Sequence, residues 1–193
     1  RKEFEKQIIS DLLWLGIKWY DPILRQSGRR KIYYKVLKDL QNRGLIYKCC
    51  CTRRDIKKAL SAPHKSDNRS IVYPGTCLHK NVDGNFVAYR LNIKKTLQNI
   101  DSKSLKFFET GHKSDQEGIE QRINPDELIT KFGDIVIARK DIGTSYNLAV
   151  VVDDAEQNVT HVTRGDDLFD VTPIQVLLQN ILSIPTPVYN HHK

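Results

Sequence analysis

All four cysteines of this chain lie within 29 positions, at Cys49, Cys50, Cys51 and Cys77. The segment 52–80 has little apolar periodicity and many basic and turn-forming residues. It cannot build much hydrophobic core unaided, so it needs another source of stability. Clustered thiols in a chain with no secretory signal are more often metal ligands than disulfides. The cluster therefore predicts a metal site that holds this segment in place.

The spacing of these cysteines suits zinc. Cys49 and Cys51 form a Cys-x-Cys pair of thiolates, the soft ligands of a tetrahedral zinc site, while the middle cysteine points elsewhere. Cys77 returns the chain to the same ion. The fourth ligand stays open between His79 and the phenolate oxygen of Tyr73. Four protein ligands leave no open position, so the zinc would be structural. The alternative is that the cysteines are ordinary small buried residues.

Charge is spread unevenly along the 193 residues. Residues 1–80 carry 19 Lys and Arg against 7 Asp and Glu, a net charge of +12, whereas residues 81–193 carry 12 against 16, a net charge of −4. A basic half joined to an acidic half indicates a polyanion partner bound at one face. The alternative is a solvated, lysine-rich surface.

The length and composition indicate one globular domain. The longest apolar stretch, Leu148–Val152, is far below the roughly 20 residues that cross a bilayer, and residues 1–20 lack the apolar run of a signal peptide. The chain begins at Arg1 and contains no methionine, so we expect a piece of a longer protein.

Hydrophobic periodicity outlines the secondary structure. Helices are predicted over residues 3–15, 32–43 and 172–182, the last with Thr172 as N-cap and Pro173 at its first position. A helical turn is expected over 124–131. Strands are predicted at 45–48, 86–93, 106–110, 134–139, 149–152 and 159–163. Alternating strands and helices indicate an α/β fold.

Two polar residues flank the predicted strands 149–152 and 159–163. Tyr146 precedes the first and Arg164 follows the second, and strand ends are where α/β proteins commonly form ligand clefts. Arginine suits a carboxylate because its planar fork donates two parallel hydrogen bonds, and tyrosine can add a phenolic one. Asp153 and Asp154 suggest a metal pair, but adjacent acids at the end of an apolar run are more often caps or surface residues.

Several longer motifs resemble the catalytic domain of the glutamyl-tRNA synthetases, and details resemble their paralogues, the glutamyl-queuosine tRNA(Asp) synthetases. The motifs that resemble the synthetases are 146–154, 159–168 and 172–175. Those that resemble the paralogues are Cys49-x-Cys51-Thr-Arg, Tyr73-Pro-Gly-Thr-Cys77, 137–146, 167–169 and 187–192. The resemblance covers nearly the whole chain.

The resemblance implies an α/β, Rossmann-like class I synthetase catalytic domain over residues 1–193, with a small zinc-binding insertion at 45–80. It implies ATP-dependent activation of glutamate and its transfer to the queuosine base in the anticodon of tRNA(Asp). The expected partners are glutamate, ATP and queuosine-bearing tRNA(Asp), with one structural Zn²⁺ ion. We expect a cytoplasmic monomer with no membrane association.

Residue by residue, Tyr146 and Arg164 match the family's glutamate-binding tyrosine and arginine. Cys49, Cys51 and Cys77 match its zinc ligands. Tyr73 matches the fourth, while His79 matches the Cys-x-His habit of full-length synthetases, so the resemblance favours Tyr73. It also places Ala149–Asp153 on a helix, against the propensity prediction.

The resemblance places the family's HIGH-like and KMSKS-like motifs outside residues 1–193, so no catalytic residue is assigned and the chain alone is expected to be inactive. One alternative is a glutamyl-tRNA synthetase that charges tRNA(Glu). Another is a non-catalytic, zinc-stabilised RNA-binding module, suggested by the basic half and its aromatic residues Trp19, Tyr33 and Tyr34. Tyr33 and Tyr34 are instead expected to pack within the second helix.

Overall fold

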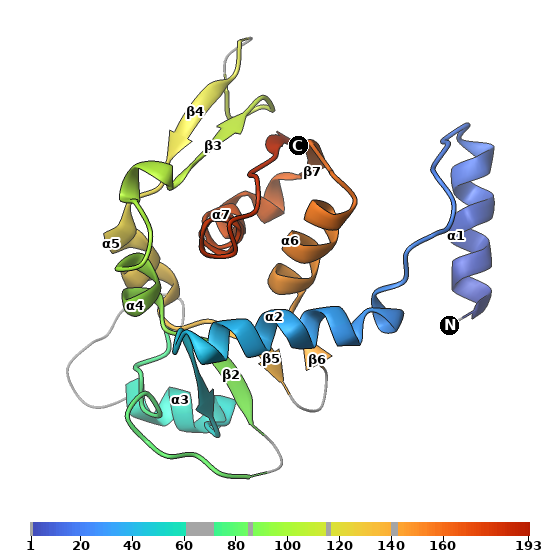
Figure 1. Cartoon of the computed structure of the whole chain (residues 1–193). Coiled ribbons are helices and arrows are strands. Elements are labelled where there is room, and N and C mark those ends of the chain that lie inside the picture. Colours follow the sequence, from blue (N-terminus) through green and yellow to red (C-terminus); the bar gives the residue numbers. More distant parts are fainter. Residues whose placement is uncertain (1, 61–71, 85–86, 115–116, 140–142) are drawn as a thin grey trace.

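The computed structural model describes residues 2–60, 72–84, 87–114, 117–139 and 143–193. Figure 1 shows two sheets with helices between and beside them. The helices are α1 (Lys2–Trp14), α2 (Arg30–Asn42), α3 (Arg53–Leu60), α4 (Ile93–Leu97), α5 (Pro125–Glu127), α6 (Tyr146–Glu156) and α7 (Thr172–Ile181). Short helical turns are η1 (Gln26–Gly28), η2 (Ser102–Ser104), the π-helical η3 (Leu128–Phe132) and η4 (Asp166–Val171).

The strands form two four-stranded sheets. They are β1 (Ile46–Cys49), β2 (Ala88–Leu91), β3 (Lys106–Glu109), β4 (Ile119–Arg122), β5 (Val136–Arg139), β6 (Gly143–Thr144), β7 (His161–Gly165) and β8 (Val188–His192). The first sheet has the order β1-β2-β5-β6 and antiparallel pairing. The second has the order β4-β3-β8-β7, in which β8 runs parallel to both β3 and β7. The predicted α/β class is confirmed.

Parallel pairing in the second sheet brings three distant segments together. Glu109, the last residue of β3, pairs with Tyr189 of β8, and Arg164 of β7 pairs with His191 of β8. Because parallel strands end at the same edge of a sheet, the carboxyl ends of β3, β7 and β8 place their polar side chains at one edge.

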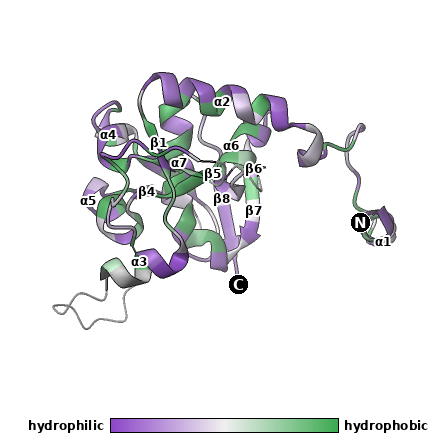
Figure 2. Cartoon of the chain, turned by 90° about the horizontal axis from the view of Figure 1, so that it is seen from below, coloured by the Kyte–Doolittle hydropathy of each residue, from purple (hydrophilic) through white to green (hydrophobic). Residues whose placement is uncertain are grey.

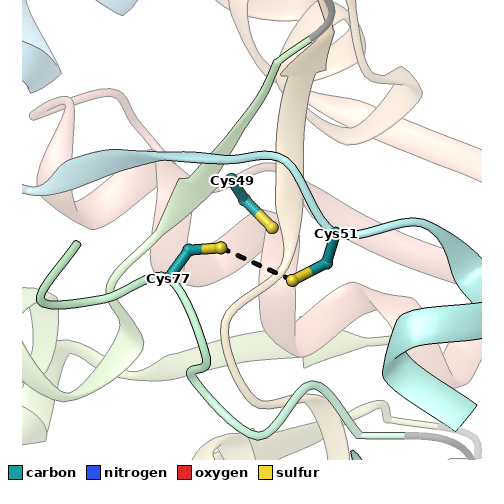
Figure 3. A group of neighbouring side chains, drawn as sticks. All are labelled: Cys49, Cys51 and Cys77. Carbon is teal, nitrogen blue, oxygen red and sulfur yellow. Dashed lines mark hydrogen bonds between the residues drawn. The ribbon is translucent and has the colours of Figure 1, made fainter. Parts of the chain in front are cut away.

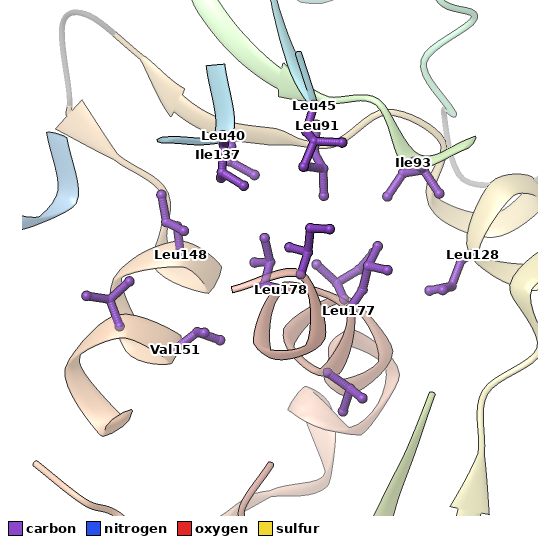
Figure 4. Close-up of a cluster of buried hydrophobic side chains, with 14 of the residues drawn as sticks. Leu40, Leu45, Leu91, Ile93, Leu128, Ile137, Leu148, Val151, Leu177 and Leu178 are labelled. Carbon is purple, nitrogen blue, oxygen red and sulfur yellow. The ribbon is translucent and has the colours of Figure 1, made fainter. Parts of the chain in front are cut away.

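The main hydrophobic core surrounds α7. Leu177 and Leu178 of this helix lie at the centre of the cluster in Figure 4, with Leu40 of α2 and Leu91 of β2 on one side and Leu148 of α6 on another. Eight of the ten residues of α7 are buried, including polar ones. Buried polar side chains require partners inside the protein, so α7 must carry polar contacts as well as packing.

The strand predicted at 149–152 is wrong, since these residues lie in α6. Ser145 begins the helix by accepting a hydrogen bond from the backbone N–H of Leu148, at 3.4 Å. Leu148 and Val151 then face the core at helical spacing (Figure 4). The β-branched composition was outweighed because strand propensity reflects packing context more than the backbone itself. The helix implied by the resemblance is correct.

Most other predicted elements are confirmed within a few residues, among them α1, α2, α7, β1, β3, β5, β7 and the helical turn at 124–131. Of the strand predicted at 86–93, residue 86 lies outside the described residues, and β2 ends at Leu91 because Asn92 caps α4 by accepting from the N–H of Lys95. Thr172 is not the N-cap of α7. It is the first helical residue, after Val171, and its hydroxyl bonds the carbonyl of Leu168 instead.

The amphipathic helix α2 shows both colours along its length in Figure 2. Tyr33 is buried against the core as predicted, but Tyr34 is exposed, so that part of the packing prediction is wrong. Helix α1 lies to one side of the body (Figure 1) and buries none of its residues. In the described ranges, helices fall short of the length and apolarity that a membrane span requires.

Candidate functional site

The three predicted cysteine ligands converge at the end of β1. Cys49 is the last residue of that strand and is buried, Cys51 follows it, and Cys77 comes from a separate loop. Figure 3 shows their sulfur atoms pointing toward one another. The sulfurs all lie within 4.8 Å of one another, and those of Cys51 and Cys77 are 3.4 Å apart. This group could hold a metal ion.

Tyr73 reaches the same point. Its hydroxyl oxygen lies 3.3 Å from the sulfur of Cys49 and 3.5 Å from that of Cys51, and it accepts a hydrogen bond of 2.9 Å from the backbone N–H of Cys77. The guanidinium of Arg90 stacks over the Tyr73 ring, 3.6 Å from its centre. Three sulfurs and one phenolic oxygen therefore surround one small volume.

These spacings suit a tetrahedral zinc ion, because ligands at about 2.3 Å from zinc lie about 3.8 Å from each other. His79 is exposed, and the metal-suited group in the described residues comprises Cys49, Cys51 and Cys77 without it. Cys50 is also exposed, with its sulfur 3.9 Å from that of Cys77.

Ionisation of the cluster is uneven. Burial opposes a thiolate at Cys77, but hydrogen bonds from Tyr73 and from the backbone at Cys50 outweigh it and lower the pKa of Cys77 to about 6. Burial raises the pKa of Cys51 to about 11. A thiolate is the form of cysteine that binds metals, so the lowered pKa of Cys77 is in keeping with a ligand role.

Arg164 lies in β7 at the edge where the parallel strands end, and protein groups hold its guanidinium in place. Its Nε donates to the Nε2 of His191 at 2.9 Å, one Nη to the side-chain oxygen of Gln175 at 2.7 Å, and the other Nη to the hydroxyl of Thr172 at 2.6 Å and, more weakly, to the carbonyl of Leu168 at 3.4 Å. All four acceptors are uncharged. The positive charge is thus fixed in position without a carboxylate among these four partners.

A guanidinium carries five N–H groups, and these bonds use four of them. Within the described part of the chain, one N–H of Arg164 remains for a ligand. The two-pronged contact with a carboxylate that the sequence suggests for Arg164 stays a prediction. Asp154 responds to the charge of Arg164: burial and the neighbouring Asp153 raise its pKa, and Arg164 opposes the rise.

Tyr146 is the first residue of α6 and is 53% exposed. The next residue, Asn147, accepts a hydrogen bond of 3.2 Å from the amide of Gln175, whose oxygen holds Arg164. Gln175 thus links the start of α6 to Arg164. The structure brings the helix start with Tyr146 and the strand with Arg164 to one side chain of α7.

The sequence predicted no role at this site for four of its side chains, of which Thr172 was expected only to cap a helix: Glu109, Thr172, Gln175 and His191. The last three stand in the quoted motifs at 172–175 and 187–192, so the motifs contained them without revealing their contacts. Glu109 lies in an ordinary alternating strand. Only the parallel pairing of β3 with β8 brings it to His191.

The sequence favoured a helix cap or a surface position for Asp153, and this prediction is wrong. Asp153 is buried and accepts hydrogen bonds from Arg29 at 2.6 Å, from the hydroxyl of Tyr33 at 2.6 Å and from Gln26 at 3.1 Å. Burial, and then the bond to this carboxylate, raise the pKa of Tyr33 to about 12. Asp153 therefore anchors α6 to α2.

A hollow of about 1020 Å³ lies between α1, residues 17–26 and α6, and Asp153 and Asp154 are in its wall. Mainly apolar side chains line it, among them Phe4, Ile8 and Trp19. Its lining includes Asp154 but none of the four hydrogen-bond partners of Arg164.

The comparisons with known proteins decide the family. A family model for the class I tRNA synthetases (E and Q), catalytic domain, matches residues 1–193. The chain belongs to this class I synthetase family. Its two sheets and central helix are one more example of that family's catalytic fold.

Similar class I synthetases carry two kinds of name. A glutamyl-Q tRNA(Asp) synthetase of Rhodobacter capsulatus is 44% identical over 197 residues, which cover 100% of this chain and 69% of that protein. One of Nocardia farcinica is 35% identical over 97% of this chain and 55% of its own length. A glutamate–tRNA ligase of a Hydrogenobaculum species is 35% identical over 98% of this chain and 39% of its own.

Among solved structures, a glutamate tRNA ligase from Elizabethkingia meningosepticum superposes with a TM-score of 0.69. It is 20% identical and matches 97% of this chain and 38% of its own. This likeness confirms the class I synthetase fold predicted from the sequence.

Proposed function

We propose that the complete protein activates glutamate with ATP and transfers it to the queuosine base of tRNA(Asp). The observation that carries the glutamate part is the guanidinium of Arg164, held by four uncharged acceptors with one N–H left over. A positive charge that uncharged acceptors hold in place at a strand end is suited to a carboxylate ligand. Tyr146, at the start of the adjoining helix, adds the second contact.

The choice of acceptor rests on similarity. The relative of Rhodobacter capsulatus, named for tRNA(Asp), matches the whole of this chain at 44% identity, against 35% for the glutamate–tRNA ligase of Hydrogenobaculum. The second candidate function is therefore charging of tRNA(Glu). A zinc-stabilised RNA-binding module without catalysis is the outcome that remains if no activation occurs.

We further propose one structural Zn²⁺ ion bound by Cys49, Cys51, Tyr73 and Cys77. The sulfur spacings and the position of the Tyr73 hydroxyl support this set, and the exposure of His79 speaks against the alternative. Such an ion would join β1 to the loop that carries Cys77. It would stabilise the zinc-binding subregion, residues 45–80, of the catalytic domain over 1–193.

The test of activation is ATP–pyrophosphate exchange with the protein expressed from its complete gene. Exchange is expected with glutamate and ATP, and not when aspartate or leucine replaces glutamate. Exchange with none of the three amino acids, with or without tRNA, would rule out both synthetase functions.

A further inference from the structure

A buried carboxylate–imidazole pair lies beside Arg164. The side chains of Glu109 and His191 are both fully buried, at 0% exposure. A buried carboxylate is costly unless hydrogen bonds compensate it, so such a pair calls for a specific reason. The pair lies next to the guanidinium of Arg164, so positioning of that guanidinium is a candidate reason.

Both carboxylate oxygens of Glu109 have hydrogen-bond partners. Its Oε1 accepts from the backbone N–H of Gly111 at 2.7 Å and from that of His191 at 2.9 Å. Its Oε2 lies 2.6 Å from the Nδ1 of His191. The backbone approaches so closely here that a Cβ on Gly111 would lie 2.1 Å from the carbonyl oxygen of His191.

The contact at the other ring nitrogen, Nε2, determines which nitrogen of His191 carries the proton. The Nε2 of His191 accepts from the Nε of Arg164 at 2.9 Å, and arginine has no acceptor atom. Nε2 must therefore be unprotonated, which leaves the proton on Nδ1, where it donates to Glu109. Neighbouring rings hold the imidazole: Tyr189 stacks on it with centroids 5.8 Å apart, and Phe169 meets it edge-on at 5.1 Å.

We propose that Glu109 acts through His191 as a positioning residue, selecting the tautomer that fixes Arg164 for the substrate carboxylate. This rests on the proposed glutamate site. Glu109 lies in β3 and has no direct contact with Arg164 among the described bonds, so its effect must pass through the imidazole. Loss of the carboxylate would turn an N–H of His191 toward the N–H of Arg164 and displace the guanidinium.

The discriminating variant is Glu109→Gln. Its amide oxygen can still accept from the backbone of Gly111 and His191, so the turn is kept. Its NH₂ group replaces Oε2, so Nδ1 must become an acceptor and Nε2 carries the proton. We expect the KM for glutamate in ATP–pyrophosphate exchange by the full-length protein to rise about tenfold, as loss of one charge-assisted contact does. The KM for ATP and the Tm should stay near those of the wild type.

A double-mutant test in the variant His191→Gln shows whether Glu109 acts through His191 or only supports the fold. His191→Gln keeps an acceptor oxygen near the place of Nε2 but has no ring for Glu109 to orient. Adding Glu109→Gln to it should change the KM for glutamate by less than about twofold. A tenfold further rise in that background would show that Glu109 acts independently of His191 and would overturn the proposal.

The tautomer can be measured directly, whether or not the variants are active. In nitrogen-15 NMR of the histidine side chains, the signals that His191→Gln removes belong to His191; they should report a neutral ring protonated at Nδ1 in the wild type and at Nε2 in Glu109→Gln. An Nε2-protonated His191 in the wild type would overturn the proposal. So would an unchanged KM for glutamate in Glu109→Gln. A wild-type protein that exchanges with no amino acid would instead defeat the proposed function itself.

Discussion

The Nε of Arg164 donates to the Nε2 of His191 across 2.9 Å, joining β7 to β8 at the edge of the second sheet. Four uncharged acceptors hold the guanidinium, so its charge is available to a ligand while its position is not free to change. This combination supports the carboxylate site that we propose at Arg164. The predictions below test the site, the metal and the two anchors of the fold.

Replacing Arg164 by alanine should weaken the use of glutamate. The loss of one charge-assisted hydrogen bond and a fixed charge corresponds to about 2 kcal/mol, or a rise of about thirtyfold in the KM for glutamate. The measurement is ATP–pyrophosphate exchange by the full-length protein. Arg122→Ala, which removes an exposed arginine of the β3–β4 hairpin, serves as control. A KM for glutamate unchanged in Arg164→Ala would remove this residue from the site.

Removal of one zinc ligand should release the metal. Elemental analysis of the wild type is expected to give about one zinc ion per chain, and Cys49→Ser should abolish it, because a thiolate at a buried position cannot be replaced by a hydroxyl. Cys50→Ser is the matched control, since its sulfur is exposed. Equal zinc loss in both variants would contradict the assigned ligand set.

The fourth ligand can be tested in the same way. Tyr73→Phe keeps the packing under Arg90 but removes the oxygen, so its zinc should dissociate more readily in a chelator titration. His79→Ala should retain the metal as the wild type does. The reverse result, loss only in His79→Ala, would transfer the fourth position to the histidine.

Asp153 should contribute more to the free energy of unfolding than an exposed acidic residue does. Asp153→Ala leaves the half-buried Arg29 with Glu156 as its carboxylate partner and leaves the hydroxyl of Tyr33 without its acceptor, a loss of about 2 kcal/mol in the free energy of unfolding. Urea denaturation of the variant measures it. The control is Asp39→Ala, which breaks an exposed pair with Arg43 and should cost about 0.5 kcal/mol or less. Similar losses in the two variants would contradict the anchoring role.

Gly111→Ala should destabilise the protein by about 3 kcal/mol, because its Cβ would meet the backbone of His191, and backbone cannot move aside as a flexible side chain can. Gly28→Ala provides the comparison, since nothing lies within 4 Å of a Cβ at that position. Denaturant midpoints of both variants check the prediction. An unchanged midpoint in Gly111→Ala would mean that the close contact of β3 and β8 is relaxed in solution.

Helices and strands with clear periodicity were predictable from the sequence, including α1, α2 and α7. Helix α6 was not predictable from propensity, because its β-branched residues favour strands locally and only the cap at Ser145 and the packing of Leu148 and Val151 favour the helix. The helix α3 and the strand β4 were also missed. Helix α3 lies within a stretch in which polar and turn-forming residues obscure any period, and β4 follows another.

The candidate site was half visible in the sequence. Arg164 and Tyr146 stand at predicted element ends, and the cysteine spacing named a metal cluster directly. Glu109 gave no signal, because its role depends on the pairing of strands 80 residues apart, which single-sequence periodicity does not encode. The hydroxyl of Thr172 was assigned to a helix cap when it instead holds Arg164.

The central claim, transfer of glutamate to queuosine in tRNA(Asp), is tested most directly by incubating the full-length protein with ATP, radiolabelled glutamate and purified tRNAs. Label should enter queuosine-bearing tRNA(Asp), but neither tRNA(Asp) that lacks queuosine nor tRNA(Glu). Label in tRNA(Glu) alone would contradict the claim and identify a glutamyl-tRNA synthetase.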